Sequence, residues 1–239
     1  MSLTKAKLLN KALRLKLRSR DLPDLARANL AALEHLEPAR PAREYSYVVM
    51  DLETTGLSID TDRVVSVAAV RMQKGQILLG DSFTELVNPG RNIPVESIKI
   101  HGIKPDQVAG ARHAADVFQD FLAWLGTDIL VAHYAEFDLH FTNFTMQRLY
   151  QFNLQNLVID LVRMCQGVVL ATDPYGINRN RHRCGLDDLA ERFGLSGAER
   201  HTAAGDALVS ALIFQRMLSQ MEQKGPARLK DLMRVAMLS

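Results

Sequence analysis

The sequence has little cysteine, no long apolar run and no internal repeats, and each absence excludes a class of protein. No apolar segment approaches the roughly 20 residues of a transmembrane helix, so we expect no membrane span and no membrane partner. Residues 1–20 are rich in Lys and Arg but lack the apolar core and cleavage site of a signal peptide. Cys165 and Cys184 are the only cysteines and form no Cys-x-x-Cys motif. We therefore expect two free thiols in a reducing cytoplasm.

The remaining composition is that of a globular protein with one sizeable domain. Its 239 residues are 47% hydrophobic, which is enough to build a core. The net charge of +2 conceals an asymmetry, because residues 1–43 hold 10 Lys/Arg and 4 Asp/Glu, whereas the rest holds 19 and 23. A basic segment beside an acidic body indicates a polyanionic partner. A solvated arm that packs on its own chain is an equally good interpretation.

Two carboxylates one residue apart follow the apolar segment Val48–Met50. Because strand side chains alternate, Asp51 and Glu53 are expected to point to the same face of a strand. Like charges side by side on a strand are unfavourable unless a cation lies between them. Mg²⁺ and Mn²⁺ prefer carboxylate oxygens, so the pair indicates a divalent metal site. The alternative is a surface strand with two solvated acids, followed by a turn.

The order of the predicted elements indicates an α/β domain with a mixed sheet. Residues 3–17 and 24–36 predict two amphipathic helices, which we interpret as a helical hairpin appended to the main domain. Strands are predicted at 45–50, 63–73 and 76–87, as an antiparallel meander, and then at 128–132 and 158–160, each followed by a helix. The longest helix is predicted at 201–223. Candidate acids come at or just after strands, where α/β sheets form their sites: Asp51, Glu53, Asp138 and Asp160.

Three separated motifs together resemble the DEDDh family of 3′–5′ exonucleases, which includes the proofreading epsilon subunit of bacterial DNA polymerase III. The motifs are Asp51-Leu52-Glu53-Thr54-Thr55-Gly56-Leu57, then Ala132-His133 with Phe137-Asp138, then His201 with Asp206. The resemblance implies an RNase H-like fold with a five-stranded mixed sheet flanked by helices. The resemblance covers the exonuclease domain (44–222), and the residue pattern adds a basic helical extension before it (1–43) and a C-terminal helical tail after it (223–239).

The resemblance further implies a role for each residue of the site. Four carboxylates would hold two divalent cations, Mg²⁺ or Mn²⁺, which stabilise the charge that phosphodiester hydrolysis builds up: Asp51, Glu53, Asp138 and Asp206. His201 would be the general base, because an imidazole exchanges its proton near neutral pH. The substrate would contact Thr54, Thr55, Gly56, Leu57, His133 and Phe137. Ordinary structural roles are the alternative for single residues, such as a helix N-cap for Asp160.

The expected function is a metal-dependent 3′–5′ exonuclease that releases nucleoside 5′-monophosphates from a single-stranded end. DNA is favoured over RNA as the substrate, and a DNA polymerase or another replication or repair protein is the expected partner. Two alternatives stay open: an RNA-trimming enzyme of the ribonuclease T or oligoribonuclease type, and a nucleic-acid-binding adaptor without catalysis. One residue departs from the family pattern, because Tyr134 stands where many relatives have asparagine.

Overall fold

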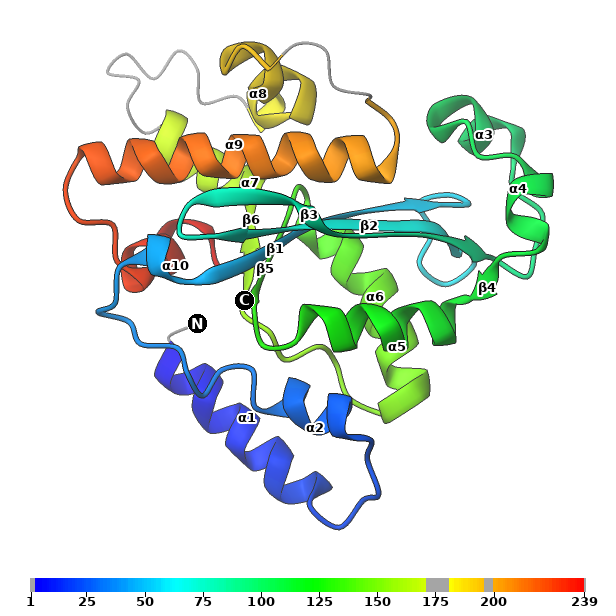
Figure 1. Cartoon of the computed structure of the whole chain (residues 1–239), viewed down its shortest axis with the longest axis horizontal. Coiled ribbons are helices and arrows are strands. Elements are labelled where there is room, and N and C mark those ends of the chain that lie inside the picture. The colour runs from blue at the N-terminus through cyan, green and yellow to red at the C-terminus, as the bar shows by residue number, and fades with distance from the viewer. Residues whose placement is uncertain (1–2, 171–180, 196–199, 239) are drawn as a thin grey trace.

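A six-stranded sheet between two layers of helices forms the body of the protein (Figure 1). The computed structural model describes residues 3–170, 181–195 and 200–238. The strand order is β4-β3-β2-β1-β5-β6; β1, β2 and β3 are antiparallel, whereas the pairs β1–β5, β5–β6 and β3–β4 are parallel. The strands are β1 (Ser46–Thr54), β2 (Val64–Gln73), β3 (Gln76–Asn88), β4 (Arg112–His113), β5 (Ile129–Ala132) and β6 (Val158–Asp160).

The helices cover both faces of this sheet. Figure 1 shows α8 and α9 on one side, and α5 and α6 on the other, with α1 and α2 beyond them. The main helices are α1 (Leu3–Leu17), α2 (Asp24–Leu30), α3 (Val95–His101), α4 (Pro105–Ala109), α5 (Ala114–Leu125), α6 (Ala135–Tyr150), α7 (Leu161–Met164), α8 (Leu186–Arg192), α9 (Ala203–Gln223) and α10 (Leu229–Ala236). Three shorter helical segments are η1 (Ala42–Glu44), η2 (Cys165–Val169) and η4 (Arg181–Cys184). Among the described residues, no helix has both the length and the apolar character needed to cross a bilayer.

The central strand β1 distributes its side chains between two cores. Tyr47 and Val49 pack with α9, where Tyr47 meets the ring of Phe214 edge-on at 4.8 Å. Val48 and Met50 belong to the core on the other face, which α5 and α6 cover. Since side chains alternate along a strand, Asp51 and Glu53 continue the row of Tyr47 and Val49 on the α9 side. The fold therefore directs the predicted acid pair toward the start of α9.

The predicted α/β architecture and element order are confirmed, with two differences. The sheet has six strands rather than the implied five, because β4 adds two residues beside the end of β3. A strand of two residues leaves no alternating pattern in the sequence. The second helix ends at Leu30 instead of residue 36, because the amides of Ala31 and Ala32 bond to carbonyls three residues back, which tightens the chain into turns.

The N-terminal helices and the turns that follow α2 contribute side chains to both cores. Leu3 and Leu36 are buried in the core that contains α9, whereas Leu17 and Leu30 are buried in the core that contains α5. A buried hydrogen bond of 2.5 Å joins the side chains of Asn29 and Asn156. The apolar side of the hairpin thus rests on the body of the protein.

The two cysteines form a disulfide, so the prediction of two free thiols is wrong. Cys165 follows α7 and Cys184 precedes α8, and both side chains are fully buried. The fold places their Cα atoms 6.0 Å apart, although 19 residues separate them in the sequence. Sequence spacing alone does not reveal this proximity, because it depends on how the chain returns after β6.

Candidate active site

Three carboxylates from two elements meet at one end of the sheet. Oxygen atoms of Asp51, Glu53 and Asp206 all lie within 4.8 Å of one another. Strand β1 supplies the first two, and small partners lie opposite them in β2, Ala68 and Ser66. Asp206 lies in the first turn of α9, whose N-cap Thr202 accepts a 3.1 Å hydrogen bond from the amide of Gly205. The structure therefore brings together three of the four acids that the sequence predicts at the site.

A fourth carboxylate, Asp138, comes from the first turn of α6 and is 3% exposed. The start of this helix is fixed by Asp160, which accepts a hydrogen bond of 2.8 Å from the amide of Ala135. Asp160 also accepts a 2.8 Å hydrogen bond from the amide of Arg163 as the N-cap of α7. One buried acid therefore orients two helices, which confirms its predicted capping role and places it behind the site.

The four acids line a cavity of about 440 Å³ that also contains His201, His133 and Phe137. Its rim carries three exposed apolar side chains, Leu57, Ile100 and Tyr134, with exposed fractions of 83, 64 and 51%. Thr54, Thr55 and Gly56 are not part of the lining; Thr54 ends β1, and Thr55 and Gly56 lead on to Leu57. The acidic floor suits a cation, and the apolar rim suits an apolar or aromatic group of a ligand.

The electrostatics of this cavity favour a bound cation. Burial, followed by the neighbouring charge of Asp138, raises the pKa of Asp51 well above its usual range. Burial and the charge of Asp206 raise the pKa of Glu53 to about 7. Burial likewise raises the pKa of Asp138. Repulsion of this kind is relieved when hard divalent ions bind carboxylate oxygens, so the donor set fits Mg²⁺ or Mn²⁺.

Among the described residues, Arg200 partly balances these acids. Arg200 forms an ion pair with Asp206 and a second, 2.8 Å long, with Asp187 of α8. Its side chain is 20% exposed. The charge of Arg200 offsets that of one carboxylate in four, and a divalent cation would offset more.

His201 lies at the mouth of the cavity, two residues before α9. Its backbone has φ of +63°, in the left-handed region, and its amide donates a 3.2 Å hydrogen bond to Asp206. A non-glycine residue in this region stores about 1–3 kcal/mol of backbone strain. Such strain is typical of functional positions, and here it turns an exposed imidazole toward the acidic cavity.

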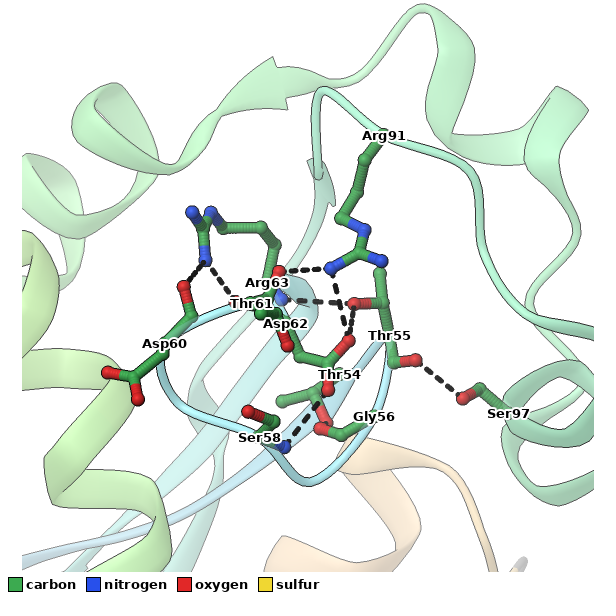
Figure 2. A network of polar contacts seen from close by, with 10 residues as sticks. All are labelled: Thr54, Thr55, Gly56, Ser58, Asp60, Thr61, Asp62, Arg63, Arg91 and Ser97. Carbon is green, nitrogen blue, oxygen red and sulfur yellow. Dashed lines mark hydrogen bonds and ion pairs between the residues drawn. The ribbon is translucent and has the colours of Figure 1, made fainter.

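A network of polar contacts holds the loop after Glu53 (Figure 2). The carboxylate of Asp62 accepts hydrogen bonds of 2.9 Å from both the hydroxyl of Thr55 and the amide of Ser58. Arg91 adds an ion pair of 3.2 Å to the same carboxylate. From the other side, the hydroxyl of Ser97 in α3 donates a buried 2.8 Å hydrogen bond to the carbonyl of Thr55. The loop that bears Leu57 is therefore held from both sides.

Two neighbouring residues join β5 to α6 at the cavity wall. His133 donates through Nε2 to the carbonyl of Cys184 over 2.7 Å, and burial lowers the pKa of its imidazole. Tyr134 has φ of +57° and meets the ring of His133 edge-on at 4.7 Å. Asparagine adopts this conformation at lower cost than tyrosine. The departure from the family pattern thus places an exposed ring at the rim and carries a conformational cost.

Several residues that shape the site did not stand out in the sequence. Asp62, Arg91 and Ser97 support the loop from outside the motifs, and Ile100 and Arg200 reach the cavity or its acids. Of these five residues, only Arg200 could have been singled out from the sequence, because it directly precedes His201. The other four depend on contacts between distant segments.

Comparisons with known proteins agree with this geometry. The family described as Exonuclease (RNase_T) matches residues 48–214. The PolC-type DNA polymerase III of Bacillus subtilis is 35% identical over 187 residues, which are 78% of this chain and 12% of that protein. The DNA polymerase III subunit epsilon-like protein of Rhodobacter capsulatus is 37% identical over 186 residues, 77% of this chain and 25% of that protein.

A solved structure shares the fold. The nuclease domain of 3′hExo, described as a DEDDh family member bound to rAMP, superimposes with a TM-score of 0.62 and 19% identity, over 79% of this chain and 96% of that domain. The chain belongs to this exonuclease family. It spans only a small part of the length of the two polymerase relatives.

Proposed function

We propose that the protein is a metal-dependent 3′–5′ exonuclease that releases nucleoside 5′-monophosphates from the 3′ end of single-stranded DNA. The observation that carries this proposal is the convergence of Asp51, Glu53 and Asp206 within 4.8 Å, in one cavity with Asp138 and His201. The unit that performs the reaction is residues 44–222, with a basic extension before it and a helical tail after it.

Each side chain has a defined task in the proposed reaction. The carboxylates of Asp51, Glu53 and Asp206 hold divalent cations, Mg²⁺ or Mn²⁺, and Asp138 completes the set. When bound, these cations supply the positive charge that stabilises a phosphate under attack. His201 accepts the proton of the attacking water, and its exposed position before α9 lets it approach the phosphate.

The loop and the rim position the strand end. Leu57 and Phe137 contact the terminal base, His133 supports the cavity wall, and the backbone of Thr54, Thr55 and Gly56 approaches the terminal sugar. An apolar rim favours unpaired bases, whose faces are free to stack. The proposed substrate is therefore a single strand rather than a closed duplex.

DNA is the proposed substrate because both sequence relatives carry names of DNA polymerase proteins. For the same reason we propose a cytoplasmic location and a DNA polymerase, or another replication or repair protein, as the partner. RNA trimming is the second candidate function, since the DEDDh domain with the same fold holds rAMP. A contact to the 2′-hydroxyl would distinguish the two substrates.

The decisive experiment is a time course on matched 5′-labelled DNA and RNA 20-mers, with Mg²⁺, Mn²⁺ or chelator. The wild-type protein is expected to shorten the DNA strand from its 3′ end only with metal. Asp51→Asn removes a central carboxylate and is expected to abolish shortening, while its circular dichroism spectrum stays native. Degradation by Asp51→Asn at the wild-type rate would contradict the assignment of the site. Faster degradation of the RNA strand would favour the second function.

A further inference from the structure

One side of α6 begins at the cavity and carries two partly buried aromatic side chains, Phe137 and Phe144, with the buried Phe141 between them. Phe137, Phe141, Phe144 and Arg148 are spaced at i, i+4, i+7 and i+11, so they lie on one side of the helix. Phe137 lines the cavity and meets the ring of Phe141 edge-on at 5.0 Å. Phe144 comes two turns after Phe137, about 10 Å further along the helix axis.

Two arginines flank the ring of Phe144. The guanidinium carbon of Arg63 lies 4.9 Å from the ring centroid, and that of Arg148 lies 5.7 Å from it. Arg63 is the first residue after the loop of Figure 2, where it donates to the carbonyls of Asp60 and Asp62. In the described part of the chain, neither arginine forms an ion pair with a carboxylate, so both charges remain available to an anion.

The chemistry of this cluster is that of a nucleic-acid contact. Phe144 is only partly buried and Arg148 is exposed, so both side chains are accessible to a ligand. A ring stacks on a base of any sequence, and a guanidinium pairs with a phosphate. Ten ångströms correspond to about three stacked nucleotides at 3.4 Å each.

We propose that Phe144 and Arg148, with Arg63 beside them, form a second binding position for the single strand, about three nucleotides upstream of the 3′ end. The strand runs from the cavity along α6. One of its bases stacks on Phe144 in place of the guanidinium of Arg148, which turns outward to pair with a phosphate. This inference rests on the proposed function, because it assumes that the 3′ end occupies the cavity. It assigns the enzyme a preference for strands long enough to reach Phe144.

The test compares a 20-mer of thymidylate with the dinucleotide, which is too short to reach Phe144. Arg148→Gln and Phe144→Leu are each expected to raise the KM for the 20-mer about tenfold, which corresponds to about 1.4 kcal/mol. The kcat for the 20-mer and both constants for the dinucleotide are expected to stay unchanged. Phe144→Trp keeps an aromatic face and is expected to keep the low KM. Arg216→Gln, an exposed arginine of α9, is the matched control.

A binding measurement keeps the inference independent of catalysis. Fluorescence anisotropy of a labelled 20-mer in chelator is expected to show weaker binding for Arg148→Gln, with the slope of log K against log salt reduced by about 0.7. Unchanged binding and unchanged KM in both variants would overturn the inference. Equal losses on the dinucleotide would also overturn it, because they indicate a structural role for the cluster. Failure of the wild-type protein to hydrolyse either substrate would overturn the proposed function, and the binding result would still decide this inference.

Discussion

The carboxylate of Asp62 occupies the space that a side chain on residue 56 would need. A Cβ atom placed on Gly56 would lie 2.5 Å from Oδ2 of Asp62 and 2.8 Å from its Cγ. A side chain at position 56 would therefore displace the carboxylate of Asp62, which holds Thr55 and Ser58 in place. The Thr-Thr-Gly turn and the network of Figure 2 form one unit.

Replacing Gly56 is therefore expected to disturb the site through Asp62 and the loop that bears Leu57. Gly56→Ala displaces Asp62 and weakens its hydrogen bonds, at a cost of about 1–3 kcal/mol in the free energy of unfolding. Because small misplacements cost activity steeply, kcat/KM is expected to fall between about 10- and 100-fold. Gly80→Ala is the control, since no atom lies within 4 Å of its added Cβ. Equal activity of the two variants, measured on a labelled single strand, would refute this account.

Stability without metal is expected to depend on the carboxyl of Glu53. Its pKa rises from 4.5 to about 7 on folding, so the folded state holds a proton that the unfolded state releases. The free energy of unfolding should therefore fall as the pH rises from about 4.5 to about 7. Mg²⁺ should oppose this fall, because it binds the ionised carboxylates and releases protons. Thermal midpoints between pH 5 and 8, with chelator or Mg²⁺, measure both effects.

The variant Glu53→Gln distinguishes the contribution of this carboxyl to the pH dependence from that of the neighbouring acids. The variant carries no titrating group at position 53, so its midpoint in chelator should depend less on pH and should gain less from Mg²⁺. A pH dependence and a gain from Mg²⁺ equal to those of the wild-type protein would show that other groups account for both effects.

Tyr134 is expected to contact the substrate, and its left-handed backbone is expected to lower the stability of the fold. Tyr134→Asn relieves a left-handed backbone that costs about 1–2 kcal/mol in other residues. It also loses the edge-on contact with His133, which is worth about 0.5–1.5 kcal/mol. The two effects nearly cancel, whereas Tyr134→Ala keeps the backbone cost and loses the contact. The free energy of unfolding in urea should therefore be about 1 kcal/mol higher for Tyr134→Asn than for Tyr134→Ala. Both variants should raise the KM for a single strand, and an unchanged KM would exclude a substrate contact.

The N-terminal extension offers a separate salt-dependent contact. Lys7, Lys11, Arg14 and Arg18 follow one side of α1 and line a groove of about 670 Å³. Lys7 bonds to backbone carbonyls and Arg14 to Glu34, which leaves Lys11 and Arg18 as the useful positions for substitution. The double variant Lys11→Gln/Arg18→Gln should weaken binding of a labelled strand at low salt and reduce the salt slope by about 1.4.

Surface substitutions are preferable here to deletion of residues 1–43, which would uncover apolar side chains of both cores. Lys230→Gln in α10 serves as the control for loss of an exposed charge. Binding by the double variant that matches this control at every salt concentration would leave the extension with a structural or protein-docking role.

The sequence predicted those features that depend on local periodicity or on motifs. The alternation along β1 placed Asp51 and Glu53 on one face, and the motifs added Asp138, His201 and Asp206, which line the same cavity. Their catalytic and metal-binding roles stay predictions until the experiments above are done. The two-residue strand β4 escaped prediction, because so short a segment carries no pattern.

Features that depend on contacts between segments distant in the sequence were not predictable. Arg91 and Ser97 reach the loop at Thr55–Asp62 from the segment beyond β3, and no spacing in the sequence indicates that approach. The disulfide between Cys165 and Cys184 is of the same kind. In each case the partner residues are set by tertiary packing rather than by neighbours along the chain.

That covalent link has a consequence for regulation. Cys184 accepts a hydrogen bond through its carbonyl from the imidazole of His133, which lines the cavity with the four acids. Thiol reductants open a disulfide and oxidants restore it. The redox state of Cys165 and Cys184 would therefore act on the cavity wall through His133, at a distance along the chain from every residue of the three motifs.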